Sequence, residues 1–304
     1  MTNGWFFVVS ALLAASSPLQ AKSFAELFPD KKMENDKAKE FAESLNYLQG
    51  DIALNAASAV LKVPNEFYFL SGDDARRVIV NAWGNPPGSA DAVLGMILPA
   101  AKTPLDDAWG AVITYDGDGY ISDADAEKSD YAEILRNMQA ATESSNADRK
   151  SGGYAPIRLV GWASPPFYDK PNHKLHWAKE IEFDGDTHHT LNYDVRALGR
   201  HGVLNMNFVA SMDQLPEIKA SIPVVMTMPE FATGSKYSDF VPGADKVAAY
   251  GIGALIAGKV AAKTGLLILG LAFLKKAWIL VAMAVAGGFG KLKSILSGRK
   301  TPEA

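Results

Sequence analysis

The chain has 304 residues, of which 48% are apolar and 21% are charged, a balance typical of a globular protein with a sizeable core. Its formal net charge of −4 argues against nucleic-acid binding through bulk electrostatics. Cysteine is absent, which excludes disulfides, thiolate metal sites and cysteine nucleophiles.

Residues 1–21 are typical of a secretory signal peptide. An apolar run from Trp5 to Ser16 precedes small and turn-forming residues, and Ala21 stands before Lys22. The run is too short to cross a hydrocarbon core, which takes about 20 helical residues. We therefore expect export and cleavage near Ala21, with an uncleaved anchor or a buried helix as the alternative.

Residues 22–245 predict an exported domain that contains both helices and strands. Apolar residues spaced three and four apart over 33–50 predict an amphipathic helix that ends at Gly50. The runs IALNAASAVLKV and EFYFL predict strands. Ser71 is expected to cap the next helix, because two aspartates follow in its first turn.

The middle of this domain predicts a strand, a helix and then a loop. WGAVITY alternates as a strand does. Ser122 and Asp125 have the spacing of a capping box, which predicts the start of a helix. Residues 142–153 are small and polar, so we expect a flexible loop there and an internal domain boundary near it.

Residues 174–183, 190–198 and 202–211 predict a three-stranded antiparallel meander, since each segment alternates and turn residues separate them. In its first strand four apolar residues are predicted to share one side: Leu175, Trp177, Ile181 and Phe183. Ser211 and Gln214 form a second capping box, and the helix after it would cover the sheet. The order lacks βαβ alternation, so the predicted fold class is α+β, an antiparallel sheet with flanking helices.

The C-terminal residues predict a membrane anchor of α-helices. Residues 277–296 form an apolar helix with terminal lysines, long enough to span as a transmembrane helix. The basic residues 297–304 would stay in the cytoplasm, which leaves the main domain in the periplasm. For the Gly/Ala-rich residues 246–276 an interfacial helix and a membrane hairpin both stay open, and their glycines favour self-association.

Several motifs occur together in this order and resemble one family. They are WGNPP, DGYISDADA, GWASPPFYD, LHWAKEIEF, LNYDVRALGRHGVLNMNF and YSDFVPGADKVAAYGIGALIAGK. The chain resembles a bacterial family of uncharacterised membrane-anchored proteins, a domain of unknown function. That resemblance implies a location in the bacterial envelope and a C-terminal anchor, and it implies no activity or site residues. Together with the predicted signal peptide and the basic tail, it leads us to expect the bacterial inner membrane.

All five histidines fall between residues 173 and 201, which raises the hypothesis of a divalent metal site. A second metal hypothesis is calcium, because YDGDGYISDAD resembles half of a calcium loop. Exposed histidines in turns, and a tight turn that leads into an aspartate-capped helix, are the preferred explanations of the two patterns, so the prediction is no cofactor, with a divalent metal as the alternative. The candidate metal ligands are His176, His188, His189, Asp116, Asp118 and Asp125.

A second set of residues is predicted to bind a ligand or a partner. Trp83, Trp162, Phe167 and Tyr168 lie in proline-rich segments that are expected to be surface loops, with an aromatic lid over the core as the equal alternative. One polar face of the meander is predicted to carry the remaining candidates, together with Glu182: His176, Glu180, Asp194 and Arg196.

These patterns favour a non-catalytic envelope module that binds another envelope protein or a ligand beside the lipid bilayer, with no nucleic acid as partner. The alternative is a periplasmic metal-dependent hydrolase that uses the His/Glu/Asp cluster at 173–201.

Overall fold

The computed structural model describes residues 18–85, 87–151, 155–184 and 187–258. Its strands are β1 (Gln20–Lys22), β2 (Tyr47–Leu54), β3 (Ala59–Val63), β4 (Phe67–Ser71), β5 (Gly95–Pro99), β6 (Gly110–Asp116), β7 (Ile157–Asp169), β8 (Lys174–Phe183), β9 (Thr190–Leu198), β10 (Val203–Ser211) and β11 (Pro229–Phe231). Its α-helices are α1 (Phe24–Leu27), α2 (Asp36–Glu43), α3 (Gly72–Arg77), α4 (Tyr131–Ser151), α5 (Leu215–Val225) and α6 (Ile252–Ile256).

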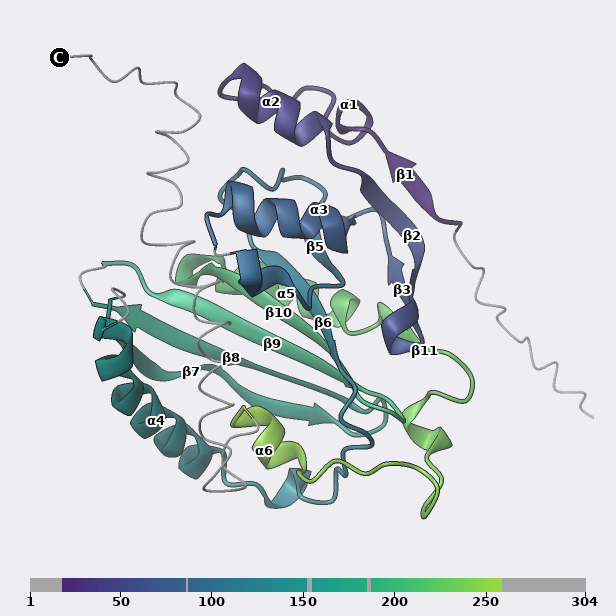
Figure 1. Cartoon of the computed structure of the whole chain (residues 1–304), viewed down its shortest axis with the longest axis vertical. Coiled ribbons are helices and arrows are strands. Elements are labelled where there is room, and N and C mark those ends of the chain that lie inside the picture. Colours follow the sequence, from purple (N-terminus) through teal and green to yellow (C-terminus); the bar gives the residue numbers. More distant parts are fainter. Residues whose placement is uncertain (1–17, 86, 152–154, 185–186, 259–304) are drawn as a thin grey trace, which may run out of the picture.

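The described strands form one sheet in the order β11-β3-β2-β4-β5-β6-β10-β9-β8-β7, and β1 pairs with β2 beside this path (Figure 1). Every pair of neighbouring strands in it is antiparallel. The α+β prediction, a large antiparallel sheet with flanking helices, is therefore confirmed. The meander is confirmed as well, since β8, β9 and β10 are adjacent and antiparallel.

The helix predicted over 33–50 is shorter than expected. α2 ends at Glu43, and the next residues enter β2. Gly50 lies inside that strand with φ 87° and does not end the helix. Tyr47, which is fully buried, donates from its hydroxyl to the carbonyl of Ala42 at 2.8 Å, so the strand residues are drawn into the core instead of extending the helix.

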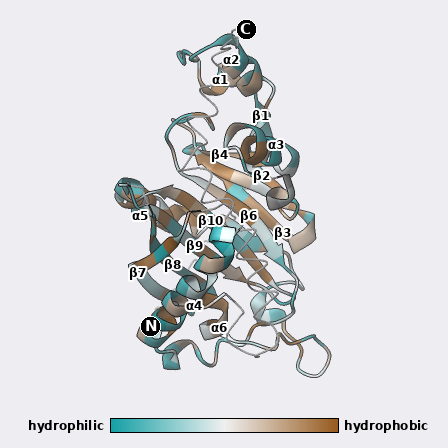
Figure 2. Ribbon diagram, turned by 60° about the vertical axis from the view of Figure 1, so that its left-hand side comes forward, coloured by the Kyte–Doolittle hydropathy of each residue, from teal (hydrophilic) through white to brown (hydrophobic). Residues whose placement is uncertain are grey.

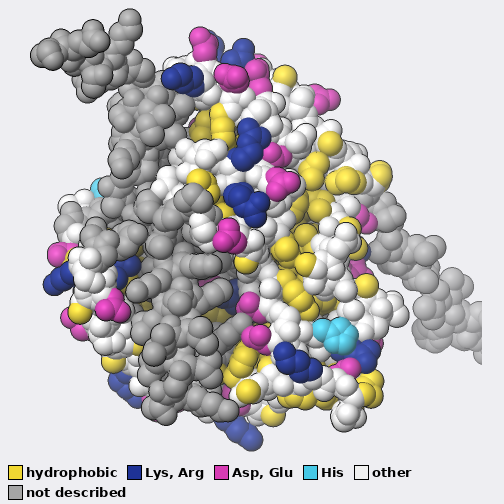
Figure 3. Space-filling view, in the orientation of Figure 1, with side chains coloured by type: hydrophobic (Ala, Val, Ile, Leu, Met, Phe, Trp, Pro, Cys, Tyr) yellow, Lys and Arg dark blue, Asp and Glu magenta, His cyan; other side chains and the backbone are white. Residues whose placement is uncertain are grey.

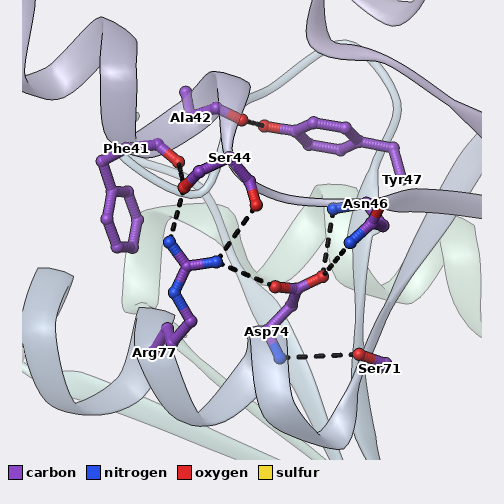
Figure 4. Close-up of polar contacts among 8 residues, drawn as sticks. All are labelled: Phe41, Ala42, Ser44, Asn46, Tyr47, Ser71, Asp74 and Arg77. Atoms are coloured by element: carbon purple, nitrogen blue, oxygen red, sulfur yellow. Dashed lines mark hydrogen bonds and ion pairs between the residues drawn. The ribbon is translucent and has the colours of Figure 1, made fainter.

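Polar contacts hold the turn after α2 against α3 (Figure 4). The buried carboxylate of Asp74 accepts from the backbone N–H of Asn46 at 3.0 Å and pairs with Arg77 at 3.1 Å. Arg77 also donates to the carbonyl of Ser44 at 3.1 Å. Ser71 caps α3 as predicted, because its hydroxyl accepts from the N–H of Asp74.

The loop predicted over 142–153 is wrong for residues 142–151, which continue α4. This helix begins at Tyr131, later than the capping box at Ser122 predicted. Its N-terminal N–H groups are taken by the carboxylate of Asp130, which accepts from Ala132 and Glu133 at 2.9 and 3.0 Å. Small polar residues resemble a loop by composition, yet here α4 lies along the edge strand β7 (Figure 1).

The sheet has two faces of different character. On the face packed against α5, which we call the apolar face, the main core contains side chains such as Tyr193, Val195, Met206 and Phe208. The other face, which we call the mixed face, is covered by α3 at one end and by α4 and α6 at the other (Figure 1). The strands through the core carry mostly hydrophobic colours in Figure 2, whereas acidic and basic side chains intermingle over α2 and α3 in Figure 3.

The described residues contain no helix that is both long enough and apolar enough to span a bilayer. The predicted anchor over 277–296 and the basic tail over 297–304 lie outside the described residues, as do residues 1–17 of the predicted signal peptide. β1 crosses the predicted cleavage point at Ala21.

Candidate functional site

A row of polar side chains runs across the mixed face between its apolar ends. We call this set the polar row: Lys179, Asn192, Asp194, Arg196, Asn205 and Asn207. The strand register places them together, because Lys179 of β8 pairs with Asn192 of β9, and Asp194 and Arg196 pair with Asn207 and Asn205 of β10. Apolar clusters under α3, α4 and α6 lie on the same face.

Asp194 is the centre of the polar row. It is 2% exposed, and its Oδ1 accepts from Arg196 at 2.8 Å and from Asn207 Nδ2 at 2.9 Å. Lys179 Nζ lies 3.1 Å from its Oδ2. Asn192 extends the row, since its amide donates to Asn207 Oδ1 at 3.0 Å. One buried carboxylate thus holds two cations and an amide in fixed positions.

The electrostatics of this centre keep the carboxylate ionised. Burial by itself would raise the pKa of Asp194, because it penalises the charged form. The positive charges of Lys179 and Arg196 and the amide of Asn207 outweigh that effect and hold the pKa below its ordinary value. The centre is therefore a permanent arrangement of two cations around one anion at neutral pH.

Several buried polar atoms on this face have no hydrogen-bond partner among the described residues, Asp194 Oδ2 among them, and three others belong to Arg196 and its neighbours. These three are the indole Nε1 of Trp177, Nε of Arg196 and Oδ1 of Asn205. The guanidinium of Arg196 lies 5.3 Å from the centre of the Trp177 ring, and Asn205 is its register partner on β10. Buried polar groups are normally satisfied, so two unused donors and one unused acceptor mark this as a place for a polar ligand or ordered water.

The prediction that Glu180, Glu182, Asp194 and Arg196 share one polar face is wrong. Asp194 pairs with Trp177 across β8 and β9, so it shares the face of that apolar residue, whereas Glu180 points to the opposite side. On that opposite side Glu180 accepts from His189 at 2.5 Å. Polar and apolar side chains do alternate along each strand as predicted. The error was to place the polar side of β8 on the same face of the sheet as the polar side of β9.

Most of the aromatic side chains that were predicted to bind a partner instead form hydrogen bonds within the fold. Trp83 and Trp162 donate from their indole nitrogens to the carbonyls of Pro104 and Tyr131, each at 3.1 Å. The hydroxyl of Tyr168 donates to Asp123 at 2.7 Å. Phe167 differs from these, because 57% of it is exposed and its ring lies 5.4 Å from that of His176.

The segment GWASPPFYD is not the surface loop that its prolines predict. It belongs to β7, the strand at the end of the sheet order. The pairing of β7 with β8 shifts register between Ser164 and Phe167, where the two prolines stand. Proline is tolerated at edge strands and bulges because no ladder hydrogen bond has to be donated there.

The histidines that lie close in sequence have separate partners in space. His173 stacks on Tyr237 with ring centres 4.2 Å apart, while His176 Nδ1 lies 2.9 Å from the hydroxyl of Tyr193. His188 is exposed at the β8–β9 turn, and His189 pairs with Glu180. Burial lowers the pKa of His176 and of His173, which favours their neutral forms.

The aspartates of the supposed calcium loop also have separate partners. Asp116 accepts from Asn205 Nδ2 at 3.1 Å, and Asp118 accepts from the hydroxyl of Tyr250 at 2.7 Å. Asp125 accepts from the first two N–H groups of α6 at 2.9 and 3.0 Å, so its position caps that helix. Across the described residues, no three His, Asp or Glu side chains are arranged to hold a metal ion.

Four members of the polar row were not anticipated from the sequence: Lys179, Asn192, Asn205 and Asn207. The two-residue spacing of polar side chains along β9 and β10 could have identified three of them. Asn205 and Asn207 flank Met206, and Asn192 and Asp194 flank Tyr193, so polar residues recur every second position on two strands that a short turn connects. Pairing those two strands in register would have brought the amides and charges together.

Comparisons with known proteins give the following. No curated protein is significantly similar in sequence. The solution structure of cyanobacterial PsbP (CyanoP) from Synechocystis sp. PCC 6803 has a TM-score of 0.34 and 10% identity, over 60% of this chain and 91% of that one. The family model DUF2167, described as a protein of unknown function, matches residues 46–286, which is well over half of the chain. The chain therefore belongs to the DUF2167 family.

Proposed function

We propose that this chain is a non-catalytic binding module of the bacterial envelope and that its ligand or partner binds at the polar row. The observation that carries this proposal is the buried centre of Lys179, Asp194 and Arg196, next to unused hydrogen-bonding atoms. The second, metal-dependent hydrolase hypothesis has no such support.

The charged side chains of the polar row are not expected to add net stability to the fold. Taking charges out of water costs several kcal/mol per ion, of the order that their mutual attraction recovers, so a buried ion cluster seldom adds net stability. Apolar side chains of similar volume would fill the same positions at no loss, as they do on either side of the row. A polar row that stability does not require is best explained by recognition.

The chemistry of the row suits a ligand with both donors and acceptors. Lys179 and Arg196 are 17% and 18% exposed at their side chains, so they reach the surface while Asp194 is enclosed. The unused atoms add the donors of Trp177 and Arg196 and the acceptor of Asn205. Arginine and asparagine in fixed positions bind carboxylate, phosphate and amide groups with directional hydrogen bonds.

The proposed setting is the inner membrane, with the described domain on the periplasmic side. Its support is the signal-like residues 1–21 and the apolar residues 277–296 with basic residues after them. A reporter fused after Ala304 tests this topology. An alkaline phosphatase fusion that is active there would contradict it, because the tail would then lie outside the cytoplasm.

The binding proposal is tested by affinity purification of the tagged full-length chain from detergent-solubilised bacterial membranes. We compare the natural chain with Arg196→Met, which removes a charge and the unused donor and keeps most of the side-chain volume. Arg158→Met is the matched control, because Arg158 is 63% exposed at its side chain and pairs with Glu182 on the other face.

The expected result is a co-purifying molecule that the natural chain and Arg158→Met both retain and that Arg196→Met loses by about tenfold or more, the effect of one charged hydrogen bond. Equal recovery with all three proteins would contradict binding at the polar row. Circular dichroism of the purified variants checks that each is folded.

A further inference from the structure

Three side chains from different segments bring possible metal-binding atoms together beside the end of β7. Tyr168 is near the end of that strand, His173 is in the turn that leads to β8, and Asp123 is in the loop after β6. The hydroxyl of Tyr168 donates to Oδ2 of Asp123 at 2.7 Å and lies 3.2 Å from Nδ1 of His173. That nitrogen is 3.9 Å from Oδ2 of Asp123. We call these three residues the Tyr–His–Asp cluster.

The distances in the cluster are close to those between atoms that bind one metal ion. Nitrogen and oxygen ligands lie about 2.0–2.2 Å from a transition metal, which puts neighbouring ligand atoms about 2.8–3.5 Å apart. The separation of His173 from Asp123 is somewhat longer, and a small rotation of the imidazole would shorten it. The cluster is compatible with the lack of a site of three His, Asp or Glu side chains among the described residues, because a tyrosine supplies the third atom.

The backbone and a neighbouring ring hold the cluster in this arrangement. His173 has a φ of 51°, in the left-handed region that residues other than glycine seldom adopt. Its N–H donates to the carbonyl of Lys170 at 3.3 Å, and its carbonyl accepts from the N–H of Leu198 at 2.9 Å. Its ring stacks on Tyr237 with ring centres 4.2 Å apart, and the hydroxyl of Tyr237 accepts from the N–H of Asp123 at 3.1 Å. One tyrosine therefore positions two of the three residues.

The cluster is partly exposed and lies in an acidic environment. The side chains of His173 and Asp123 are 31% and 22% exposed. The negative charge of Asp169 acts on both the phenol and the imidazole and adds to that of Asp123. The adjacent cation Lys170 is paired with Glu127 at 3.0 Å, which offsets its charge. These charges attract a cation to the cluster.

The combination of ligand atoms favours ferric iron over a divalent ion. Tyrosine has to lose its proton to become a strong ligand, and burial together with the hydrogen bond and charge of Asp123 raises the pKa of Tyr168. A metal ion must displace that proton, which takes a large positive charge. A phenolate and a carboxylate are hard oxygen ligands, which suit a trivalent ion better than the softer ions that prefer sulfur or several imidazoles.

We propose that Tyr168, His173 and Asp123 form a binding site for ferric iron. The ion would take the place of the phenolic proton, which is released to water, and would bind Oη of Tyr168, Nδ1 of His173 and Oδ2 of Asp123. Water or a chelating anion that delivers the iron would fill its other coordination positions. The cluster shares no residue with the polar row, so this inference does not depend on ligand binding there.

The experiment adds ferric nitrilotriacetate to the purified full-length chain in detergent and removes unbound iron by gel filtration. Mass spectrometry measures the bound iron, and an iron–phenolate bond gives a charge-transfer band in the visible spectrum, which a titration can follow. Tyr168→Phe removes the phenolate and keeps the ring. His173→Asn removes the imidazole, and asparagine tolerates the left-handed backbone at that position. Tyr131→Phe is the matched control, because the hydroxyl of Tyr131 donates to the carbonyl of Ala126 within the same apolar cluster as Tyr168.

We expect the natural chain and Tyr131→Phe to bind about one iron per chain and to show the band. Tyr168→Phe should lack the band, and His173→Asn should bind iron at least about tenfold more weakly. A natural chain without the band, or a band that persists in Tyr168→Phe, would overturn the proposal. Equal affinity of His173→Asn and the natural chain would overturn it as well. Circular dichroism checks that each variant is folded.

Discussion

The two faces of strand β9 differ in what their side chains touch. Tyr193 and Val195 point into the apolar face and belong to the main core with Phe208 and Met206. Asp194 and Arg196, which alternate with them, point into the mixed face and form the polar row. One short segment of chain therefore contributes to the stability of the fold on one side and, we propose, to recognition on the other.

In a sheet that is covered on both sides, function is best sought on the face whose side chains stability does not explain. The hydrophobic effect accounts for a buried apolar face, because its burial stabilises the fold. A buried row of charges adds little net stability, so its presence requires another explanation. Substitutions on each face test whether this distinction holds.

The largest effect is expected on the apolar face. Phe208→Ala removes a fully buried ring that lies 5.1 Å from Trp109 and 6.0 Å from Tyr193. Cavity formation should lower the free energy of unfolding by about 3–5 kcal/mol, measured by urea denaturation. Phe167→Ala is the control, because Phe167 is 57% exposed, and it should change that energy by less than about 0.5 kcal/mol. Similar losses for both would contradict the assignment of the core.

A smaller loss is expected when the polar row is broken. Asp194→Ala leaves Lys179 and Arg196 without their shared anion, and both side chains are more than four-fifths buried. We expect a loss of about 3 kcal/mol, at the low end for breaking a buried ion pair because the cations can turn to solvent. Urea denaturation measures it, and a change near zero would show that Asp194 does not anchor the cations.

Replacing the whole charged centre should have the opposite outcome. In the triple variant Lys179→Met, Asp194→Leu, Arg196→Met, apolar side chains of similar size take over the site. The free energy of unfolding should stay equal to that of the natural chain or rise by about 1–4 kcal/mol. A loss as large as that of Asp194→Ala would mean that the centre serves stability, which would remove the argument for recognition.

The pH dependence of stability offers a subtler test. The folded pKa of Asp194 lies below its unfolded value of about 3.9, so ionised Asp194 stabilises the fold above that value. This contribution is lost as the pH falls through the folded pKa. Between pH 5 and the acid transition, Asp194→Asn should therefore show a shallower decline in the free energy of unfolding than the natural chain. Parallel curves would contradict the lowered pKa.

The smallest effect is expected for a solvent-exposed ion pair at the β11 end of the sheet, away from the polar row. Lys62 and Glu230 join β3 to β11 with side chains 42% and 52% exposed. Because water screens such a pair, Lys62→Gln should lower the free energy of unfolding by less than about 1 kcal/mol, and high salt should reduce the difference further. A loss equal to that of Asp194→Ala would erase the contrast between exposed and buried charges.

The fold was predictable in its parts. The strands β8, β9 and β10 follow from alternation and turn residues, and α3 follows from its cap at Ser71. Where prediction failed, a long-range contact had overruled composition. The small polar residues of α4 form a helix because Asn146 and Gln139 find partners on β7, and Pro165 lies in a strand because β7 is at the edge.

The candidate site was predictable only in part. Asp194 and Arg196 were recognisable as polar residues in a strand, yet they were assigned to the face of Glu180. Lys179 was overlooked because it interrupts an otherwise apolar side of β8. The pairing of Trp177 with Asp194 is what unites these residues.

By itself, the sequence determined the strand and turn pattern, the helix caps and the alternation along each strand, because these depend on neighbours a few residues away. Only the tertiary structure decided which sides of adjacent strands coincide, how charges meet at Asp194 and which element closes the edge of β7. The physical reason is the two-residue period of a strand: a shift of one residue in pairing exchanges the two faces, and contacts distant in sequence determine that pairing.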